Sequence, residues 1–295
     1  MLFMRSIFVI LVSMFFLLPA HAIKIEGVSE SDYDPSVGDS DDPGHNEDYD
    51  DNLGDTISFT EIYQDGHFIR LDNNKMSFHI NRGHCLIASD KHDTFIEGSC
   101  DELSKKMKNI YTKKITEIMQ KLKSSMTPEA IEMMKNLRGD DVNAKLKKLS
   151  TGEVSGIDSA IFSAGSNKYW LSVSILDQIK KEMDYTKFLE IQQKFEDAYT
   201  SIEVHFGDGD KTRHIEKELS RMGYLMKQTE TDTLNSMTKN MLTPEQIKLF
   251  EGMDQNETVV LEVLSVSYNK VDLSKIKPSG NKVSIEQYVQ MNFEE

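Results

Sequence analysis

The chain has 295 residues, a formal net charge of −15 and only two cysteines. This acidity argues against nucleic-acid binding, because proteins that bind phosphate backbones carry basic patches, whereas here the lysines are interleaved with glutamates. The length suits one large domain or two small ones.

Residues 1–22 have the pattern of a cleaved secretory signal peptide. Arg5 supplies one positive charge, an apolar run follows, and the segment ends in the small-residue pattern Ala20-His21-Ala22. The apolar run is shorter than the ~20 residues that a membrane-spanning helix needs, which argues against a stable membrane anchor. We therefore expect a secreted, extracellular protein.

Residues 23–55 form a strongly acidic segment. Between Glu26 and Asp55 there are 12 Asp or Glu residues and no Lys or Arg. Such a composition buries too little apolar surface to fold, so we expect a disordered arm. It would be a solubilising spacer, a weak binder of divalent cations or an attachment to a basic surface. An EF-hand loop starting at Asp48 is excluded, because Leu53 and Phe59 occupy the positions that require Gly and Glu.

Residues 56–100 alternate short β-branched and aromatic runs with the turn pairs Asp65-Gly66, Asn73-Asn74 and Arg82-Gly83. This predicts a small antiparallel sheet. The two cysteines, Cys85 and Cys100, most simply form a disulfide, which would stabilise the fold by about 3 kcal/mol. A zinc site is the rival interpretation, but its spacing matches no zinc pattern; its candidate ligands are His79, His84, His92 and the two cysteines.

Two similar segments, residues 126–137 and 242–253, suggest an internal repeat with an offset of 116 residues. Each contains Thr-Pro-Glu, which starts a helix because Thr caps the first turn and Pro needs no amide hydrogen there. An apolar helical stripe over residues 101–125 leads into the first copy. We expect helical repeat 1, with a long connecting helix, over residues 101–212 and helical repeat 2 over residues 213–295.

The connecting helix is predicted over residues 170–199, with a break near Asp184. Its aromatic stripe is either core or the lining of an apolar ligand cavity. Residues 201–212 have the order of a phosphate-binding loop but the wrong spacing, so we interpret them as an acidic turn before a helix that begins near Arg213. Asn256 is the acceptor of the only glycosylation sequon that we identify, which makes the protein a candidate glycoprotein.

Two helix starts within Lys/Glu-rich sequence resemble the nematode SXP/RAL family of secreted antigens. They are MTPEA at residues 126–130 and LTPEQ at residues 242–246. That resemblance implies a small helical protein that binds divalent cations or small ligands. It covers about a dozen residues per copy and carries over no functional residue.

We therefore predict an α+β protein that is mostly α-helical, with a small disulfide-closed β segment followed by two divergent copies of a helical unit. The predicted function is secreted and non-enzymatic, with an unidentified extracellular protein or an apolar small molecule as the partner and no cofactor or metal. The alternatives are a hydrolase, in which His205 or His214 would meet a carboxylate and a hydroxyl, and cation binding by the acidic arm.

Overall fold

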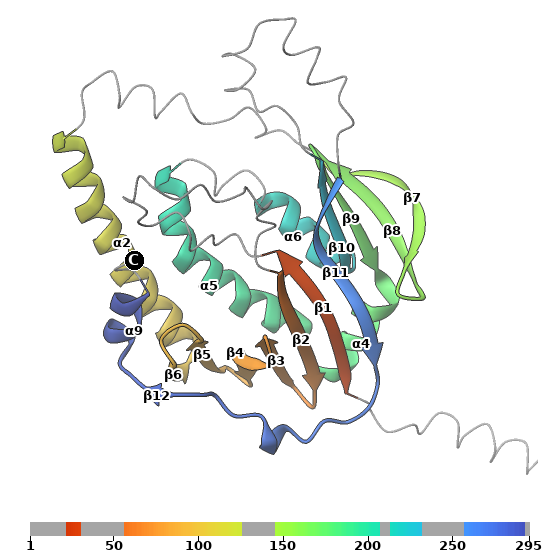
Figure 1. The fold of residues 1–295 in the computed structure, drawn as a ribbon, viewed down its shortest axis with the longest axis horizontal. Helices are drawn as coiled ribbons and strands as arrows, with labels where there is room; N and C mark the ends of the chain where they lie inside the picture. Colours follow the sequence, from red (N-terminus) through yellow and green to blue (C-terminus); the bar gives the residue numbers. More distant parts are fainter. Residues whose placement is uncertain (1–21, 31–55, 126–144, 207–212, 232–256, 293–295) are drawn as a thin grey trace, which may run out of the picture.

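The computed structural model describes residues 22–30, 56–125, 145–206, 213–231 and 257–292 (Figure 1). Twelve strands within these ranges form one sheet in the order β12-β6-β5-β4-β3-β2-β1-β11-β10-β9-β8-β7. All neighbours are antiparallel except β12 and β6, which are parallel. The first described strand, β1 (Ile23–Glu30), lies in the middle of this sheet.

One half of the sheet is a meander of consecutive hairpins. Its tight turns use residues with positive φ, among them Asp65, Asn73 and Arg82, as the turn pairs in the sequence predicted. The meander ends where Cys85 and Cys100 form a disulfide. Its strands are β2 (Thr56–Gln64), β3 (His67–Asp72), β4 (Lys75–Asn81), β5 (His84–Ser89) and β6 (Thr94–Ser99).

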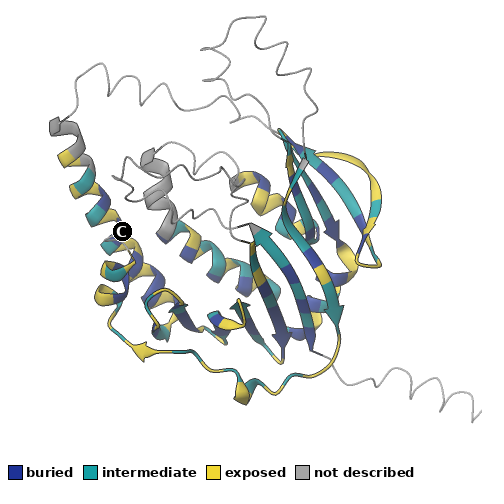
Figure 2. Cartoon of the chain, viewed as in Figure 1, coloured by how far each residue is buried: buried dark blue, intermediate teal, exposed yellow. Residues whose placement is uncertain are grey.

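Helices cover one face of the meander. Helix α2 (Cys100–Ser125) packs along α5 (Tyr185–Phe206), while α4 (Val173–Glu182) contacts β1, β2 and β10. Apolar residues recur at helical spacing on α2 and α5, and these stripes are buried against the sheet (Figure 2). The aromatic stripe of α5 is therefore core; the stripes consist of Leu103, Met107, Ile115, Phe188, Ile191 and Phe195.

The other half of the sheet consists of β7 (Lys147–Val154), β8 (Ile157–Ala164), β9 (Asn167–Ser172), β10 (Tyr224–Thr231) and β11 (Glu257–Ser267). Helix α6 (Arg213–Met222) packs here: Ile215 and Leu219 contact a second apolar cluster that includes Phe162, Tyr169 and Leu171. Strand β7 is largely exposed, whereas most residues of β8 are buried or half-buried (Figure 2).

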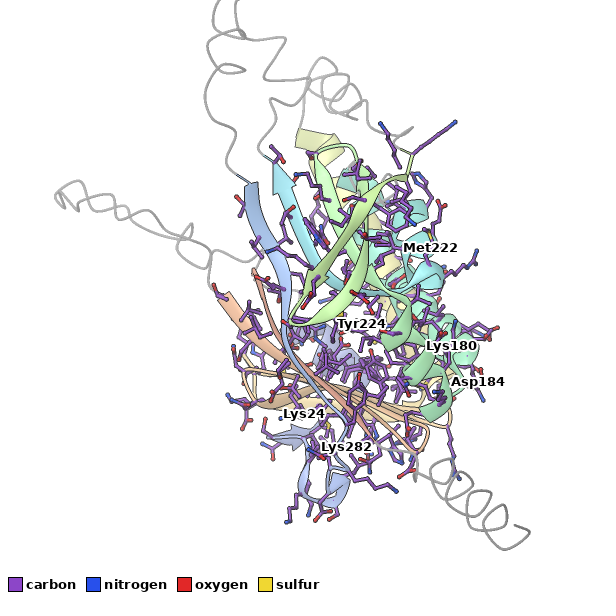
Figure 3. All side chains as sticks on the ribbon, turned by 90° about the vertical axis from the view of Figure 1, so that its right-hand side faces the viewer. Lys24, Lys180, Asp184, Met222, Tyr224 and Lys282 are labelled. Atoms are coloured by element: carbon purple, nitrogen blue, oxygen red, sulfur yellow. A yellow bond between two sulfur atoms is a disulfide. The ribbon has the colours of Figure 1, made fainter. Side chains whose placement is uncertain are left out.

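A C-terminal strap, residues 268–292, crosses the face of the meander that the helices leave open. Val271, Leu273 and Ile276 of the strap pack on Ile62, Ile69, Met76 and Leu86. Its last helix instead packs on α2, and Tyr288 and Val289 of that helix belong to the core on the helix-covered face. Lys282 of the strap and Lys24 of β1 project on the side of the sheet away from Lys180 and Asp184 of the helical layer (Figure 3). The strap contains a 3-10 helix (Leu273–Lys275), β12 (Asn281–Lys282) and α9 (Ile285–Met291).

The fold is therefore not mostly α-helical, which corrects the prediction from sequence. The two helical repeats, residues 101–212 and 213–295, contain β7 to β9 and β10 to β12 respectively. The 116-residue offset aligns residues 108–115 of helix α2 with residues 224–231, but these form β10, which lies between β9 and β11. Residues 23–30, assigned to the acidic arm, form β1 because Ile23 and Ile25 are buried in the core.

Several local predictions are confirmed. The meander spans the predicted range, a helix follows it, the connecting helix breaks near Asp184, and α6 begins at Arg213. Trp170, predicted to be helical, lies on β9 instead. Residues 31–55 of the acidic arm and both Thr-Pro-Glu segments lie outside the described residues, so the interpretations of them, including the SXP/RAL resemblance, stay predictions.

Candidate functional site

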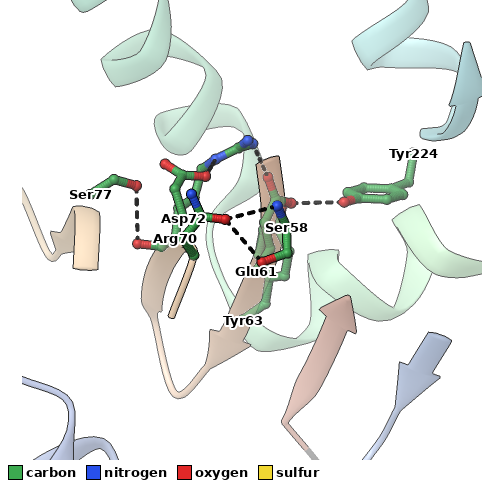
Figure 4. A network of polar contacts seen from close by, with 8 residues as sticks. Ser58, Glu61, Tyr63, Arg70, Asp72, Ser77 and Tyr224 are labelled. Carbon is green, nitrogen blue, oxygen red and sulfur yellow. Dashed lines mark hydrogen bonds and ion pairs between the residues drawn. The ribbon is translucent and has the colours of Figure 1, made fainter. Parts of the chain in front are cut away.

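A polar network is centred on Glu61, in the helix-covered face of the sheet (Figure 4). Phe59, Glu61 and Tyr63 alternate along β2, so all three side chains point into the core layer. The hydroxyls of Tyr63 and Tyr224 donate to Glu61 Oε2 at 2.7 and 2.8 Å. Arg70, opposite Glu61 on β3, donates to Glu61 Oε1 at 3.1 Å.

The charged groups of this network are paired with one another. Arg70 also donates from Nε to Asp72 at 2.9 Å and stacks over the Phe59 ring at 4.9 Å. Burial, together with the nearby Glu61 carboxylate, raises the pKa of Tyr63 and Tyr224 well above 10, so both hydroxyls remain donors at neutral pH. Because both oxygens of Glu61 are occupied, we interpret the network as a structural link between β2, β3 and β10, not as a catalytic acid.

The hydrolase prediction requires His205 or His214 to meet a carboxylate and a hydroxyl. His214 is exposed on α6, and the side chain of His205 is outside the described part of the structure. Nothing in the described ranges places a histidine against Glu61, so no described constellation supports the hydrolase alternative.

A hollow lies where the β7–β8 hairpin, the start of α4 and Tyr268 meet. Its volume of about 880 Å³ falls in the range of small-molecule and peptide sites. The hollow exists because the chain turns abruptly from β9 into α4 after Ser172, leaving Val173 and Ser174 facing the hairpin. Val173 and Tyr268 are 54% and 44% exposed, which makes them an apolar part of an open site.

Two carboxylates give this hollow its charge. Glu153 and Asp158 are directly opposite each other across the hairpin and both line the hollow. Like charges in such cross-strand pairs are destabilising. Both side chains are exposed, and no lysine or arginine within the described ranges forms an ion pair with either. The hollow can therefore accept a cationic group beside apolar surface.

A second polar feature lies on the strap-covered face of the meander. His67 Nδ1 and His79 Nε2 are 3.0 Å apart, so one ring nitrogen donates to the other. The pKa of His79 is lowered to about 4, chiefly by burial and also by His67 and His84. Burial likewise lowers the pKa of His67.

The cysteine prediction is confirmed and the zinc alternative is not. Cys85 and Cys100 are bonded to each other, with 4.9 Å between their Cα atoms, so neither is a thiolate ligand. His79, His84 and His92 do not converge: among the described residues, no three His, Cys, Asp or Glu side chains lie together in an arrangement that could hold a metal ion. Asn256 lies outside the described residues, and its glycosylation stays a prediction.

Sequence reasoning missed the hollow. Only the bordering hairpin has a signal, in residues 153–158, EVSGID, where a Ser-Gly pair between alternating residues is typical of a hairpin. The Glu61 network also has a signal in the sequence. Phe59, Glu61 and Tyr63 occupy alternate positions, and the middle one is charged where the pattern calls for an apolar residue.

No protein-family model, curated protein or solved structure matches this chain. No helix in the described ranges is long and apolar enough to cross a membrane.

Proposed function

We propose that this is a secreted, non-enzymatic binding protein whose hollow receives a basic side chain, flanked by apolar residues, from an extracellular partner protein. The observation that carries the proposal is the pairing of Glu153 with Asp158 beside exposed Val173 and Tyr268. A guanidinium or ammonium group would relieve the repulsion between the two carboxylates. The aromatic ring would contact the alkyl stem of that side chain or its charge.

A protein partner is favoured over an apolar small molecule for two reasons. The hollow is open and carries two carboxylates, and an apolar ligand would cover these carboxylates without offering them a charge or a hydrogen bond, which is costly. In addition, the helical stripes that could have lined an apolar cavity are packed in the core. The disulfide supports an extracellular location, since such bonds persist in oxidising compartments.

The test is selection of peptides from a random displayed library on the immobilised mature protein, followed by affinity measurement with one selected synthetic peptide. We expect selected peptides to place Arg or Lys next to an aromatic or aliphatic residue. We also expect binding to weaken as salt rises, because exposed charge pairs are screened.

The decisive comparison is between variants of the mature protein. Glu153→Gln combined with Asp158→Asn should weaken binding of the selected peptide by about tenfold or more, equivalent to ~1.4 kcal/mol. Glu218→Gln removes an exposed carboxylate on α6, away from the hollow, and should leave affinity unchanged. The proposal is wrong if the selection enriches no basic peptides, or if the double variant and Glu218→Gln bind equally well.

A further inference from the structure

His67, His79 and Asn81 occupy adjacent positions on one face of the meander. His67 lies directly opposite Asn81 in the pairing of β3 with β4. Paired residues share a face, and so do residues two positions apart on a strand, which adds His79 to the same face. The side chains of all three are therefore close neighbours.

The two rings are aimed at each other. Their nitrogens are 3.0 Å apart, their planes differ by only 14°, and their centroids are 5.3 Å apart. The distance between the centroids equals the distance between the two nitrogens plus the radius of each ring. Each nitrogen therefore lies on the line that joins the two ring centres, and the two nitrogens point at each other. If the shared hydrogen moves to the outer nitrogen of its own ring, two imidazole lone pairs face the same small space.

Asn81 adds an acceptor that lacks a donor. Its side-chain oxygen is buried and has no hydrogen-bond partner, one of only three such side-chain atoms in the described part of the chain. Leaving a buried acceptor unsatisfied costs about 1–3 kcal/mol, so an amide oxygen in this position is suited to a cation or a donor supplied from outside.

We propose that His67, His79 and Asn81 bind one divalent copper ion, through two imidazole nitrogens and one amide oxygen, with water in the remaining positions. Imidazole nitrogen suits copper, and copper stands highest in the affinity order of divalent first-row metals. Two nitrogens held about 2.0 Å from one ion and 3.0 Å apart subtend roughly 97° at it, closer to the right angle of tetragonal copper coordination than to the tetrahedral angle. Zinc, which prefers tetrahedral angles, is expected to bind more weakly.

Binding requires both rings to turn. Because the nitrogens now point at each other, each ring must swing away from the line between them so that the ion can lie beside that line. Both rings are only partly buried, which leaves room for this movement. His84 is also opposite Asn81, on β5, but its ring is exposed and lies 3.9 Å from Glu97, so we do not count it as a ligand.

The test is electron paramagnetic resonance of the mature protein with one equivalent of Cu²⁺, together with calorimetric titration of Cu²⁺. We expect one site per chain, with hyperfine coupling to two imidazole nitrogens. His67→Gln and His79→Gln should each weaken binding by tenfold or more, since even residues that merely orient metal ligands contribute about 10–100-fold. Asn81→Asp should tighten binding, because a carboxylate is a stronger ligand than an amide, and this gain is not explained by misfolding.

The matched control is His45→Gln, which removes a histidine from the acidic segment of the sequence. It should leave the two-nitrogen signal unchanged. The proposal is overturned if copper is coordinated by oxygen alone, if the two-nitrogen signal disappears in His45→Gln, or if His67→Gln and His79→Gln bind copper as the unaltered protein does. The peptide-binding measurements at the hollow are independent of all these outcomes.

Discussion

The two halves of the sheet differ in how completely they are covered. The meander, β2 to β6, has helices on one face, the C-terminal strap on the other and a disulfide at its end. The half from β7 to β11 has α6 over part of one face and ends in the exposed edge strand β7, whose hairpin with β8 borders the hollow. We infer that the meander half supplies most of the stability, whereas the hairpin half is free to carry binding.

The largest effect should come from Glu61, which holds the halves together through Arg70 of β3 and Tyr224 of β10. Glu61→Ala leaves Arg70 with only Asp72 to offset its charge and leaves two buried hydroxyls without their acceptor. We expect the free energy of unfolding to fall by about 3–5 kcal/mol in urea denaturation followed by circular dichroism. Glu61→Gln keeps an acceptor and should lose less; equal losses would contradict this role.

Removing the disulfide should have the second-largest effect on the free energy of unfolding. Cys85→Ala combined with Cys100→Ala opens a loop of 15 residues and should lower the free energy of unfolding by about 3 kcal/mol. Trp170 is the only tryptophan and lies on β9, so its fluorescence reports the hairpin half. If this variant unfolds with the same free energy as the unaltered protein, the assignment of stability to the meander half is wrong.

Tyr224→Phe removes one hydroxyl and tests the link between the halves more gently. A buried hydrogen bond to a carboxylate contributes about 2 kcal/mol, and we expect a loss of that size. We also expect the tryptophan and circular dichroism transitions, coincident in the unaltered protein, to separate in this variant. Coincident transitions with an unchanged midpoint would show that the link contributes nothing.

Alkaline pH should weaken the packing of α5 against α6. Burial raises the pKa of Tyr185 to about 12 from its ordinary value of 10, and its hydroxyl donates to Ser220 O at 3.0 Å. The contribution is complete below pH 10, where the unfolded chain is also neutral, and is lost as pH rises from 10 to 12. We expect a loss on the order of 1 kcal/mol, allowing for partial exposure, and a shallower pH dependence in Tyr185→Phe.

The hollow should affect stability least. Removing the charges of Glu153 and Asp158 relieves repulsion between exposed groups, so the free energy of unfolding should rise or stay within about 0.5 kcal/mol. Differential scanning calorimetry of Glu153→Gln with Asp158→Asn measures this directly. A large loss would mean that the carboxylates serve the fold and not a partner.

Local signals in the sequence predicted the meander well and the rest poorly. Alternation and turn pairs identify β2 to β6, and helical periodicity identifies α2, because both depend on neighbours in the chain. In β7, KKLSTGEV, six of eight residues are exposed, so no apolar alternation marks it as a strand. Only its pairing with β8 makes it one.

Strand β1, in the middle of the sheet, was not predicted because of the acidic residues that follow it. Ile23 and Ile25 alternate with Lys24 and Glu26, as a strand requires, but the acidic composition that follows led us to assign this stretch to the arm. The hollow could not have been predicted, because it depends on Tyr268 being brought beside Val173 and the hairpin by the tertiary fold. Neither residue carries a recognisable motif.

The position of β1 also determines when the molecule can finish folding. Its two neighbours are β2, which follows soon after it in the chain, and β11, where Ser265 bonds to Glu26 across 239 positions of sequence. During synthesis, β1 must therefore wait for the long segment up to β11 before its second edge is paired. Such long-range pairing is slow, so we expect the meander to form early and the joining of the two halves to be the late, rate-limiting step.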